Sequence, residues 1–162
     1  MAMLLSEKQI AQLKRRVTET PHPREMVLDV LHAIQEAKGW VSDEGIELAA
    51  AILGLTPLQV EEIATFYDKI YRRPVGRKVI HVCDSICCWS RGSEAIMLRL
   101  QQLLGIAPGE TTADGMFTLL PTCCLGACGD APAVRIGKNL YGRVTPEDLA
   151  GILEGERTEA GP

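Results

Sequence analysis

Aromatic residues are rare in this chain. Phe, Trp and Tyr together make up 4% of its 162 residues, so the core must be built from Leu, Ile, Val and Ala. A strong charge of either sign is also absent, since 17 Lys and Arg stand against 21 Asp and Glu for a net charge of −4. A mildly acidic chain lacks the positive field that attracts nucleic acids and anionic membranes. We therefore expect no nucleic-acid partner.

Long apolar runs are missing as well. The apolar start of the chain is very short, and Glu7 and Lys8 follow it at once, whereas a secretory signal needs a longer apolar region. The most apolar stretch, residues 46–55, contains Glu47 and is far shorter than the roughly 20 residues that span a bilayer. We therefore expect a cytosolic chain without direct membrane insertion, where thiols stay reduced.

The sequence also lacks motifs that bind nucleotides or carry out catalysis. It contains no G-x-G-x-x-G and no G-x-x-x-x-G-K-[ST]. Nor does it contain a Ser/His/Asp or Cys/His set at a plausible spacing. We therefore expect a chain without a complete active site of its own.

Residues 1–73 have the apolar spacing of helices. One apolar stripe occupies residues 27–34, and Gly39 is a stop signal shortly after it. Thr56 begins another helix, because Gln59 three positions later completes a capping-box pattern. This part of the chain is predicted to be a helical region.

The pattern changes at residues 72–76, where Arg, Pro and Gly indicate a domain boundary. The elements expected after it are a strand at 78–82, a helix at 93–104, a strand at 116–120, a hairpin at 133–136 and 140–144, and a short helix that Thr145 caps. These elements predict an α+β or α/β domain at 74–155. A flexible polar tail is expected at 156–162.

All six cysteines lie in the second half of the chain, in two groups. The groups are Cys83, Cys87 and Cys88, and Cys123, Cys124 and Cys128. Each group follows a predicted strand, and loops at strand ends are where α/β folds place their sites. If the two strands are neighbours, the two groups meet in space.

The cysteine spacing favours some metal sites over others. No C-x-x-C occurs, which weakens zinc ribbons, thioredoxin-type dithiol catalysis and c-type haem. The remaining spacings are C-x₄-C from Cys83 to Cys88 and C-x₃-C from Cys124 to Cys128. Four thiolates in two pairs suit a [2Fe–2S] cluster. On spacing alone, zinc stays open as the alternative.

These segments carry a family resemblance. Cys83-x₄-Cys88-Trp89 with Arg91-Gly92, and then Cys124-Leu125-Gly126-Ala127-Cys128, resemble the thioredoxin-like [2Fe–2S] ferredoxin subunit of respiratory complex I, the 24-kDa-type subunit of NADH–quinone oxidoreductase. The helical half resembles the same family at Lys38-Gly39-Trp40-Val41, Thr56-Pro57 and Ala64-Thr65-Phe66-Tyr67. The match runs from about residue 10 to about residue 153.

The resemblance implies an N-terminal helical bundle followed by a thioredoxin-like [2Fe–2S] ferredoxin domain. It implies one [2Fe–2S] cluster whose ligands are Cys83, Cys88, Cys124 and Cys128. Cys87 and Cys123 are then extra cysteines, for which a role as small buried hydrophobic residues is expected.

The resemblance also implies partners. The chain would exchange single electrons with FMN on a flavoprotein subunit that binds FMN and NADH, with residues 1–73 as the docking region. A multi-cluster iron–sulfur subunit is a second candidate neighbour. The expected location is the peripheral arm of a membrane complex, on the cytoplasmic face of a bacterial inner membrane.

Three alternatives stay open at this point. The same module occurs in NAD-linked formate dehydrogenases and NAD-reducing hydrogenases. A zinc-stabilised adaptor that docks a partner through the helical half is a different class of protein, and metal analysis distinguishes it. A thiol oxidoreductase is disfavoured, because the chain has no C-x-x-C.

Overall fold

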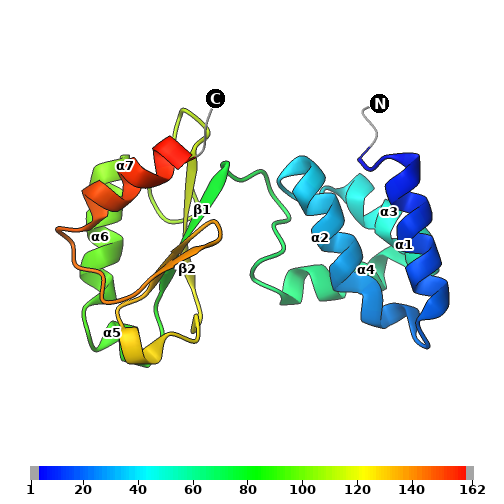
Figure 1. Ribbon diagram of the computed structural model, residues 1–162, viewed down its shortest axis with the longest axis horizontal. Helices are drawn as coiled ribbons and strands as arrows, with labels where there is room; N and C mark the ends of the chain where they lie inside the picture. The colour runs from blue at the N-terminus through cyan, green and yellow to red at the C-terminus, as the bar shows by residue number, and fades with distance from the viewer. Residues whose placement is uncertain (1–3, 160–162) are drawn as a thin grey trace. The chain divides into compact units, whose positions relative to one another are not determined.

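The computed structural model describes residues 4–159, in two compact units that divide after Pro74 (Figure 1). Residues 4–74 are the helical unit and residues 75–159 the sheet unit. The sequence pattern placed this boundary one residue earlier, after Arg73.

Residues 4–74 form four α-helices and one short 3₁₀-helix, where the apolar spacing predicted helices. They are α1 (Glu7–Glu19), η1 (Pro23–Met26), α2 (Val27–Lys38), α3 (Asp43–Leu53) and α4 (Pro57–Phe66). Aliphatic side chains of these helices meet in one core, whose fully buried members include Val30, Leu31, Ile34, Ala49 and Val60. The core holds no aromatic ring among its buried residues, in keeping with the composition.

Capping boxes fix where two of these helices begin. The Thr56 hydroxyl accepts a hydrogen bond from the Gln59 N–H, and the Gln59 side chain accepts one from the Thr56 N–H. The predicted capping box at α4 is therefore confirmed. Ser6 and Gln9 form the same box at α1, where none was expected from the sequence.

Arg72 ties the end of the helical unit to its helices. Its Nε lies 2.9 Å from a Glu61 carboxylate oxygen, and its Nη2 lies 2.8 Å from Asp43 Oδ1. It also donates a hydrogen bond to the carbonyl of Val41. The guanidinium thus joins α3, α4 and the segment before α3, so Arg72 belongs to the helical unit rather than to a free linker.

The helices are too short to span a membrane singly. Among residues 4–159, no single helix is long and apolar enough to cross a bilayer. Helices α3 and α4 reach the required length and apolarity only as a pair, and they are bent by 116° at the break between them.

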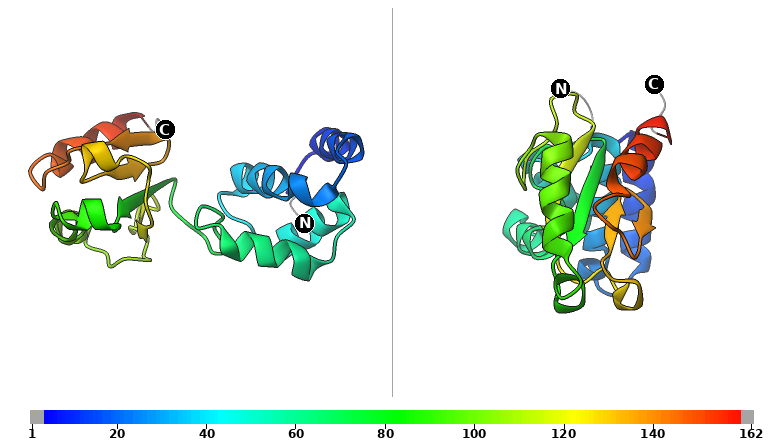
Figure 2. Two further views of the ribbon diagram at one scale, coloured as in Figure 1. Left: turned by 90° about the horizontal axis from the view of Figure 1, so that it is seen from below. Right: turned by 90° about the vertical axis from the view of Figure 1, so that its left-hand side faces the viewer.

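The sheet unit is one mixed sheet with helices packed on it. Its strands β1 (Lys78–Cys83), β2 (Phe117–Thr122), β3 (Val134–Ile136) and β4 (Asn139–Tyr141) lie in the order β2-β1-β3-β4. Its helices are α5 (Ile86–Trp89), α6 (Ser93–Leu104), η2 (Cys128–Asp130) and α7 (Leu149–Glu159). Helices α6 and α7 lie side by side on one face of the sheet (Figures 1 and 2). This arrangement is the expected α+β fold.

An apolar core fills the space between this sheet and its helices. Its fully buried side chains include Ile80, Leu100, Phe117, Leu119, Ile136 and Leu149. All six cysteines lie within the described residues, and none of them belongs to this core. The cysteines and the main apolar core are therefore separate parts of the sheet unit.

Strands β1 and β2 are parallel neighbours. This is the condition under which the sequence predicted that the two cysteine groups meet. Lys78 lies opposite Phe117 at one end of the pair, and Cys83 lies opposite Thr122 at the other. Strand β2 runs two residues past the predicted end at Leu120, so it reaches the second cysteine group directly. Pro121 is tolerated there because β2 is an edge strand, where a missing N–H costs no ladder hydrogen bond.

The expected flexible tail at 156–162 is wrong for residues 156–159, which belong to helix α7. Glu156 is only 1% exposed. Its carboxylate pairs with the Lys78 ammonium and accepts hydrogen bonds from Asn139 (2.8 Å) and the Tyr141 hydroxyl (2.7 Å). The charged side chains suggested a solvated end, but Glu156 follows Leu149 and Leu153 on the buried face of the helix. Residues 160–162 lie outside the described residues.

The environment of Glu156 favours its charged form. Burial by itself raises the pKa of this carboxyl. The hydrogen bonds from Lys78, Tyr141 and Asn139 outweigh burial, so the pKa of Glu156 lies below the ordinary value for glutamate. The ion pair therefore fastens the end of α7 to the start of β1.

Replacing this carboxylate tests the attachment of α7. We expect Glu156→Ala to lower the free energy of unfolding of the sheet unit by about 3–5 kcal/mol, because it removes the carboxylate of a buried ion pair. Guanidinium denaturation followed by far-UV circular dichroism measures the change. Glu154→Ala is the matched control, since Glu154 is exposed on the same helix. Equal stability of the two variants would contradict this role.

The same ion pair predicts a pH dependence. A carboxyl whose folded pKa is depressed stabilises the fold above its unfolded pKa, about 4.3 for glutamate, and loses that effect as the pH falls through its folded pKa. The difference in unfolding free energy between the wild type and Glu156→Ala should therefore be constant near neutral pH and narrow in acid.

Candidate metal centre

The parallel pairing of β1 and β2 brings the two cysteine groups to one edge of the sheet. Cys83 is the last residue of β1 and lies opposite Thr122, directly before Cys123. The Asp84 N–H donates to the carbonyl of Thr122 (3.0 Å), so the pairing continues one step past Cys83. Figure 1 shows α5 and the loop around residues 123–130 at the same end of the sheet.

The first group is held by the short helix α5. The backbone turns at Ser85, directly before α5, and the Ser85 carbonyl accepts a hydrogen bond from the Cys88 N–H (2.9 Å). This turn brings Cys88 back beside the end of β1. Cys83 and Cys88, the buried pair, are each 2% exposed and pack against Ala131 and Ala133.

The second group is a tight loop in which two sulfurs approach each other. The Sγ atoms of Cys124 and Cys128, the exposed pair, are 3.4 Å apart. The Gly126 N–H donates to Cys124 Sγ at 3.4 Å. Gly126 has φ +80°, a left-handed conformation in which a glycine avoids the Cβ penalty. The glycine backbone at this position therefore lets an N–H approach the Cys124 sulfur.

Contacts between thiols link the two pairs. The Cys83 thiol shifts the pKa of both Cys88 and Cys124, which indicates that it lies near a member of each pair, and the Cys124 and Cys128 sulfurs are 3.4 Å apart. The four cysteines singled out in the sequence therefore lie in one continuous group. Cys87 is half-buried and packs against the group formed by the buried pair, Ala131 and Ala133. Cys123 is exposed, so the expected buried role is wrong for that residue.

The pKa values of the thiols reflect these contacts. The pKa of Cys124 is lowered mainly by the hydrogen bond from the Gly126 N–H and to a smaller extent by Cys128. The pKa of Cys128 is raised to about 11, mainly by the neighbouring Cys124 thiol and to a smaller extent by Cys87. The pKa of Cys88 is raised mainly by burial and to a smaller extent by the neighbouring Cys83 thiol. Cys124 is thus the sulfur of the exposed pair whose thiolate form is favoured.

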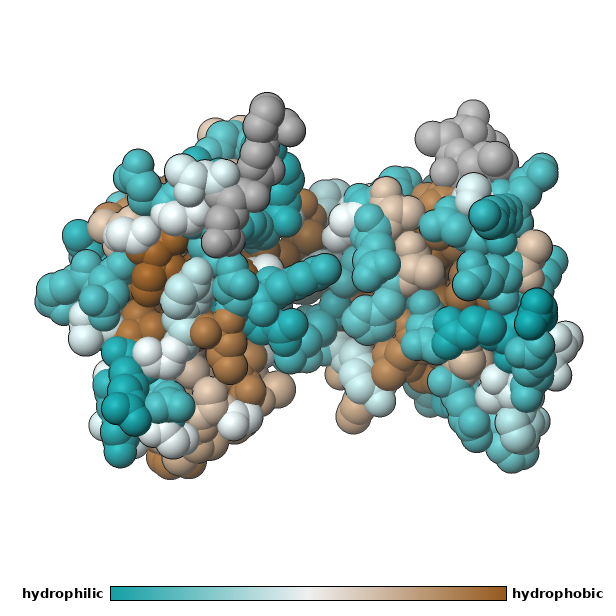
Figure 3. All heavy atoms as spheres, in the orientation of Figure 1, coloured by the Kyte–Doolittle hydropathy of each residue, from teal (hydrophilic) through white to brown (hydrophobic). Residues whose placement is uncertain are grey.

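The surroundings of the cysteines are partly apolar and partly open. Among them, Trp89 is 53% and Ile86 71% exposed. Beside them is a groove of about 320 Å³, lined in part by Trp89, Met97 and Pro121. Figure 3 shows apolar residues reaching the surface at this end of the sheet unit. Among residues 4–159, no three His, Cys, Asp or Glu side chains form a set that could hold a single metal ion.

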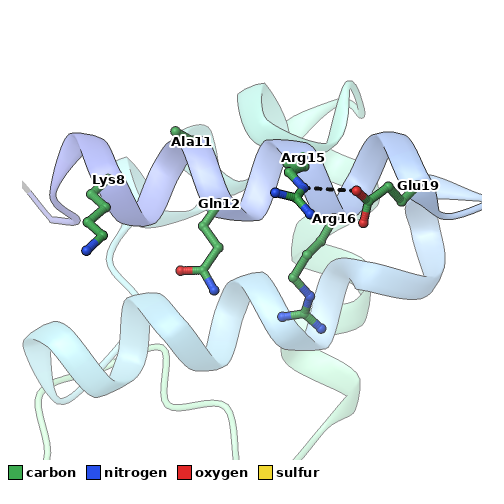
Figure 4. A pocket seen from close by; sticks show the side chains of 6 residues that line it. All are labelled: Lys8, Ala11, Gln12, Arg15, Arg16 and Glu19. Carbon is green, nitrogen blue, oxygen red and sulfur yellow. Dashed lines mark hydrogen bonds and ion pairs between the residues drawn. The ribbon is translucent and has the colours of Figure 1, made fainter.

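A pocket elsewhere on the chain does not resemble a site. It measures about 480 Å³ and is lined by Lys8, Ala11, Gln12, Arg15, Arg16 and Glu19, all from helix α1 (Figure 4). Arg15 is already paired with Glu19 at 3.0 Å, and Arg16 with Asp29 at 2.7 Å. Its lining comes from one face of a single helix, so the cysteine group remains the candidate centre.

A comparison with protein-family models decides the family of the chain. The model described as thioredoxin-like [2Fe–2S] ferredoxin matches residues 13–157. This chain belongs to the thioredoxin-like [2Fe–2S] ferredoxin family. The match includes both cysteine groups and most of the helical unit.

Two curated relatives of this ferredoxin share one name. The E subunit of NADH-quinone oxidoreductase from Pseudomonas aeruginosa is 42% identical over 151 residues, which are 93% of this chain and 91% of the relative. The protein of the same name from Escherichia coli K12 is 40% identical over 153 residues, which are 94% of this chain and 92% of the relative. The similarity therefore covers both units.

A solved structure shares the fold of the ferredoxin. A chain of an NAD⁺-reducing [NiFe]-hydrogenase in the air-oxidized state matches 83% of this chain with a TM-score of 0.69 and 24% sequence identity. This chain spans only 23% of that hydrogenase chain. The likeness shows a shared fold and nothing finer.

The cysteines fit the cluster that names the family. A [2Fe–2S] cluster takes four thiolates, two on each iron. The buried pair and the exposed pair supply two such sets, and both lie at the end of the adjacent strands β1 and β2. The Gly126 N–H supplies a hydrogen bond of the kind that stabilises ligand sulfur. The ligand assignment itself stays a prediction.

The backbone at Gly126 offers a direct test of the loop. We expect Gly126→Ala to cost about 1–2 kcal/mol, because a Cβ is disfavoured in the left-handed region. Bound iron should then pass faster to a chelator than in the wild type. Gly129→Ala is the control, since Gly129 lies in the same loop region with no positive φ and open space at its Cβ position. Equal iron release from both variants would contradict this role of Gly126.

Proposed function

We propose that this ferredoxin carries one [2Fe–2S] cluster on Cys83, Cys88, Cys124 and Cys128 and serves as the electron-transfer subunit of an NADH–quinone oxidoreductase. The observation that carries the proposal is the convergence of two cysteine pairs at the edge of adjacent parallel strands. The naming of relatives at 40–42% identity as the E subunit of that enzyme supports the host complex.

The chain's own residues provide an asymmetric binding site. Cys83 and Cys88 are buried against alanines, which keeps water from one side of the site. Cys124 and Cys128 are exposed and face solvent or a partner. When bound, a [2Fe–2S] cluster accepts and releases one electron at a time at a low potential. Electron exchange with a partner is therefore best served through the exposed pair.

The proposed partner is a flavoprotein subunit that binds FMN and NADH. The sequence contains no nucleotide-binding motif, and the proposed enzyme oxidises NADH, so another subunit has to supply that chemistry. This chain would exchange electrons with the FMN of that subunit. A neighbouring multi-cluster iron–sulfur subunit is the second proposed contact, and the cytoplasmic face of a bacterial membrane is the proposed location.

The helical unit offers a docking surface for this partner. Phe66 is 78% and Tyr67 43% exposed at the end of α4, with their ring centroids 5.2 Å apart in an edge-to-face pair. Leu58, on the same helix, is 78% exposed. Exposed aromatic residues of this kind are common anchors of protein interfaces.

Substituting each cysteine tests the cluster and its ligands. The recombinant chain should contain about two irons and two sulfides and show an S = 1/2 electron paramagnetic resonance signal after dithionite reduction. Serine at Cys83, Cys88, Cys124 or Cys128 should abolish or alter that signal. Cys87→Ser and Cys123→Ser are the matched controls and should retain two irons.

Two outcomes of this experiment would contradict the proposal. A colourless protein that contains zinc would favour the structural adaptor. Loss of the cluster in Cys87→Ser or Cys123→Ser, with retention in a neighbouring variant, would move the ligand set by one residue.

Partner capture tests the host complex. A tagged chain expressed in its native host should co-purify with a subunit that contains FMN and is reduced by NADH. Phe66→Ser should reduce that yield strongly, because an aromatic anchor contributes about 2 kcal/mol or more to an interface. Leu140→Ser is the control, as Leu140 is 53% exposed in the sheet unit. Capture of hydrogenase or formate dehydrogenase subunits instead would assign the chain to another host.

A further inference from the structure

The groove beside the cysteines is lined mostly by apolar side chains. It measures about 320 Å³ and lies wholly within the sheet unit. Its apolar lining comes from β1, α5, α6, β2 and the loop after α6, and consists of Val82, Trp89, Met97, Pro108 and Pro121. Trp89 is 53% exposed, and Ile86, three residues earlier on α5, is 71% exposed. Residues three apart on a helix are neighbours, so the apolar surface continues from the groove across α5.

Two exposed carboxylates stand at this groove. Asp84 directly follows β1, and Glu94 is the second residue of α6. Within residues 4–159, neither of them belongs to an ion pair. None of the described residues that line the groove is a lysine, an arginine or a histidine. The groove therefore combines an apolar wall with uncompensated negative charge, which favours a partner that carries positive charge.

The groove lies where the cover of the sheet edge ends. Strand β2 is an edge strand, and residues 109–112 run along its outer side. The Gly109 N–H donates to the Leu119 carbonyl (2.7 Å), and the Leu119 N–H donates to the Glu110 carbonyl (3.1 Å). Two residues further along β2, the next outward position is Pro121, which has no N–H to donate. A partner is therefore held here by its side chains rather than by adding a strand.

We propose that this groove binds a basic segment of the flavoprotein subunit, which places an apolar side chain against Trp89 and a lysine or arginine beside Asp84 and Glu94. The inference rests on the proposed function, because it names how that partner is recognised. A partly exposed tryptophan that becomes buried is a typical centre of binding energy, and the charges set the orientation and the association rate. Asp84 and Trp89 directly follow Cys83 and Cys88 in the chain, so this partner would lie beside the proposed centre.

Binding of the full chain to the purified flavoprotein subunit tests the apolar part of the groove. Trp89→Ala should weaken the affinity about 30-fold, which is the effect of removing one strong anchor from an interface. Leu98→Ser is the matched control, because Leu98 is 57% exposed on α6 but does not line the groove. Iron content and far-UV circular dichroism are measured first, so that a loss of affinity is separated from a loss of the cluster or of the fold.

Charge reversal tests the acidic part at a residue further from the cysteines in the chain. Glu94→Lys should weaken the affinity about 3-fold or more at low ionic strength, and the difference from the wild type should shrink at high ionic strength because salt screens exposed charges. Glu147→Lys is the matched control, since Glu147 is an exposed carboxylate of the sheet unit outside the groove. This variant keeps the test decisive where Trp89→Ala loses iron.

The outcomes separate this inference from the proposed function. Equal affinity of the wild type and Glu94→Lys at low ionic strength, or of the wild type and an iron-loaded Trp89→Ala, would overturn the inference and leave the proposed function standing. A dimer of the chain that Trp89→Ala converts to a monomer would also overturn it, because the occupant would then be a second copy. A wild-type chain that holds its cluster but does not bind the flavoprotein subunit would overturn the proposed host, and this inference with it.

Discussion

The parallel register of β1 and β2 is the constraint on which the candidate centre depends. The two cysteine groups are about 40 residues apart in the sequence, yet Cys83 ends one strand opposite Thr122 at the end of the other. A shift of one residue would turn Cys83 to the opposite face of the sheet. The spacing within each group then needs only a four-residue turn and a glycine loop. The pairing of β1 with β2 is therefore what brings these two distant groups together.

Strand β1 connects this centre to a second polar feature at its other end. Lys78 begins the strand and pairs with Glu156 of α7, while Cys83 ends it. Between them, Ile80 and Val82 are buried in the apolar core of the sheet unit. The Lys78–Glu156 pair and the core therefore set where β1 lies, and the position of β1 in turn sets where the first cysteine group lies.

Local sequence signals predicted most of the fold and the cysteine groups. The capping box at Thr56 and the β-branched strand before Cys83 depend on residues a few positions apart, so the sequence alone indicated them. Burial of Glu156 depends on partners from two distant strands. The polar composition of residues 156–162 therefore wrongly predicted a flexible tail that includes this residue. The exposure of Cys123, where a buried residue was expected, likewise follows from tertiary packing, which no local spacing reveals.

The separation of the cysteines from the main apolar core has a consequence for biogenesis. Ile80, Phe117 and their neighbours close the core of the sheet unit without any sulfur ligand. Small zinc domains, in contrast, lack such a core and stay unfolded until metal arrives. Here the polypeptide can complete its scaffold first, and the exposed sulfurs of Cys124 and Cys128 would leave the proposed site open to iron and sulfide afterwards.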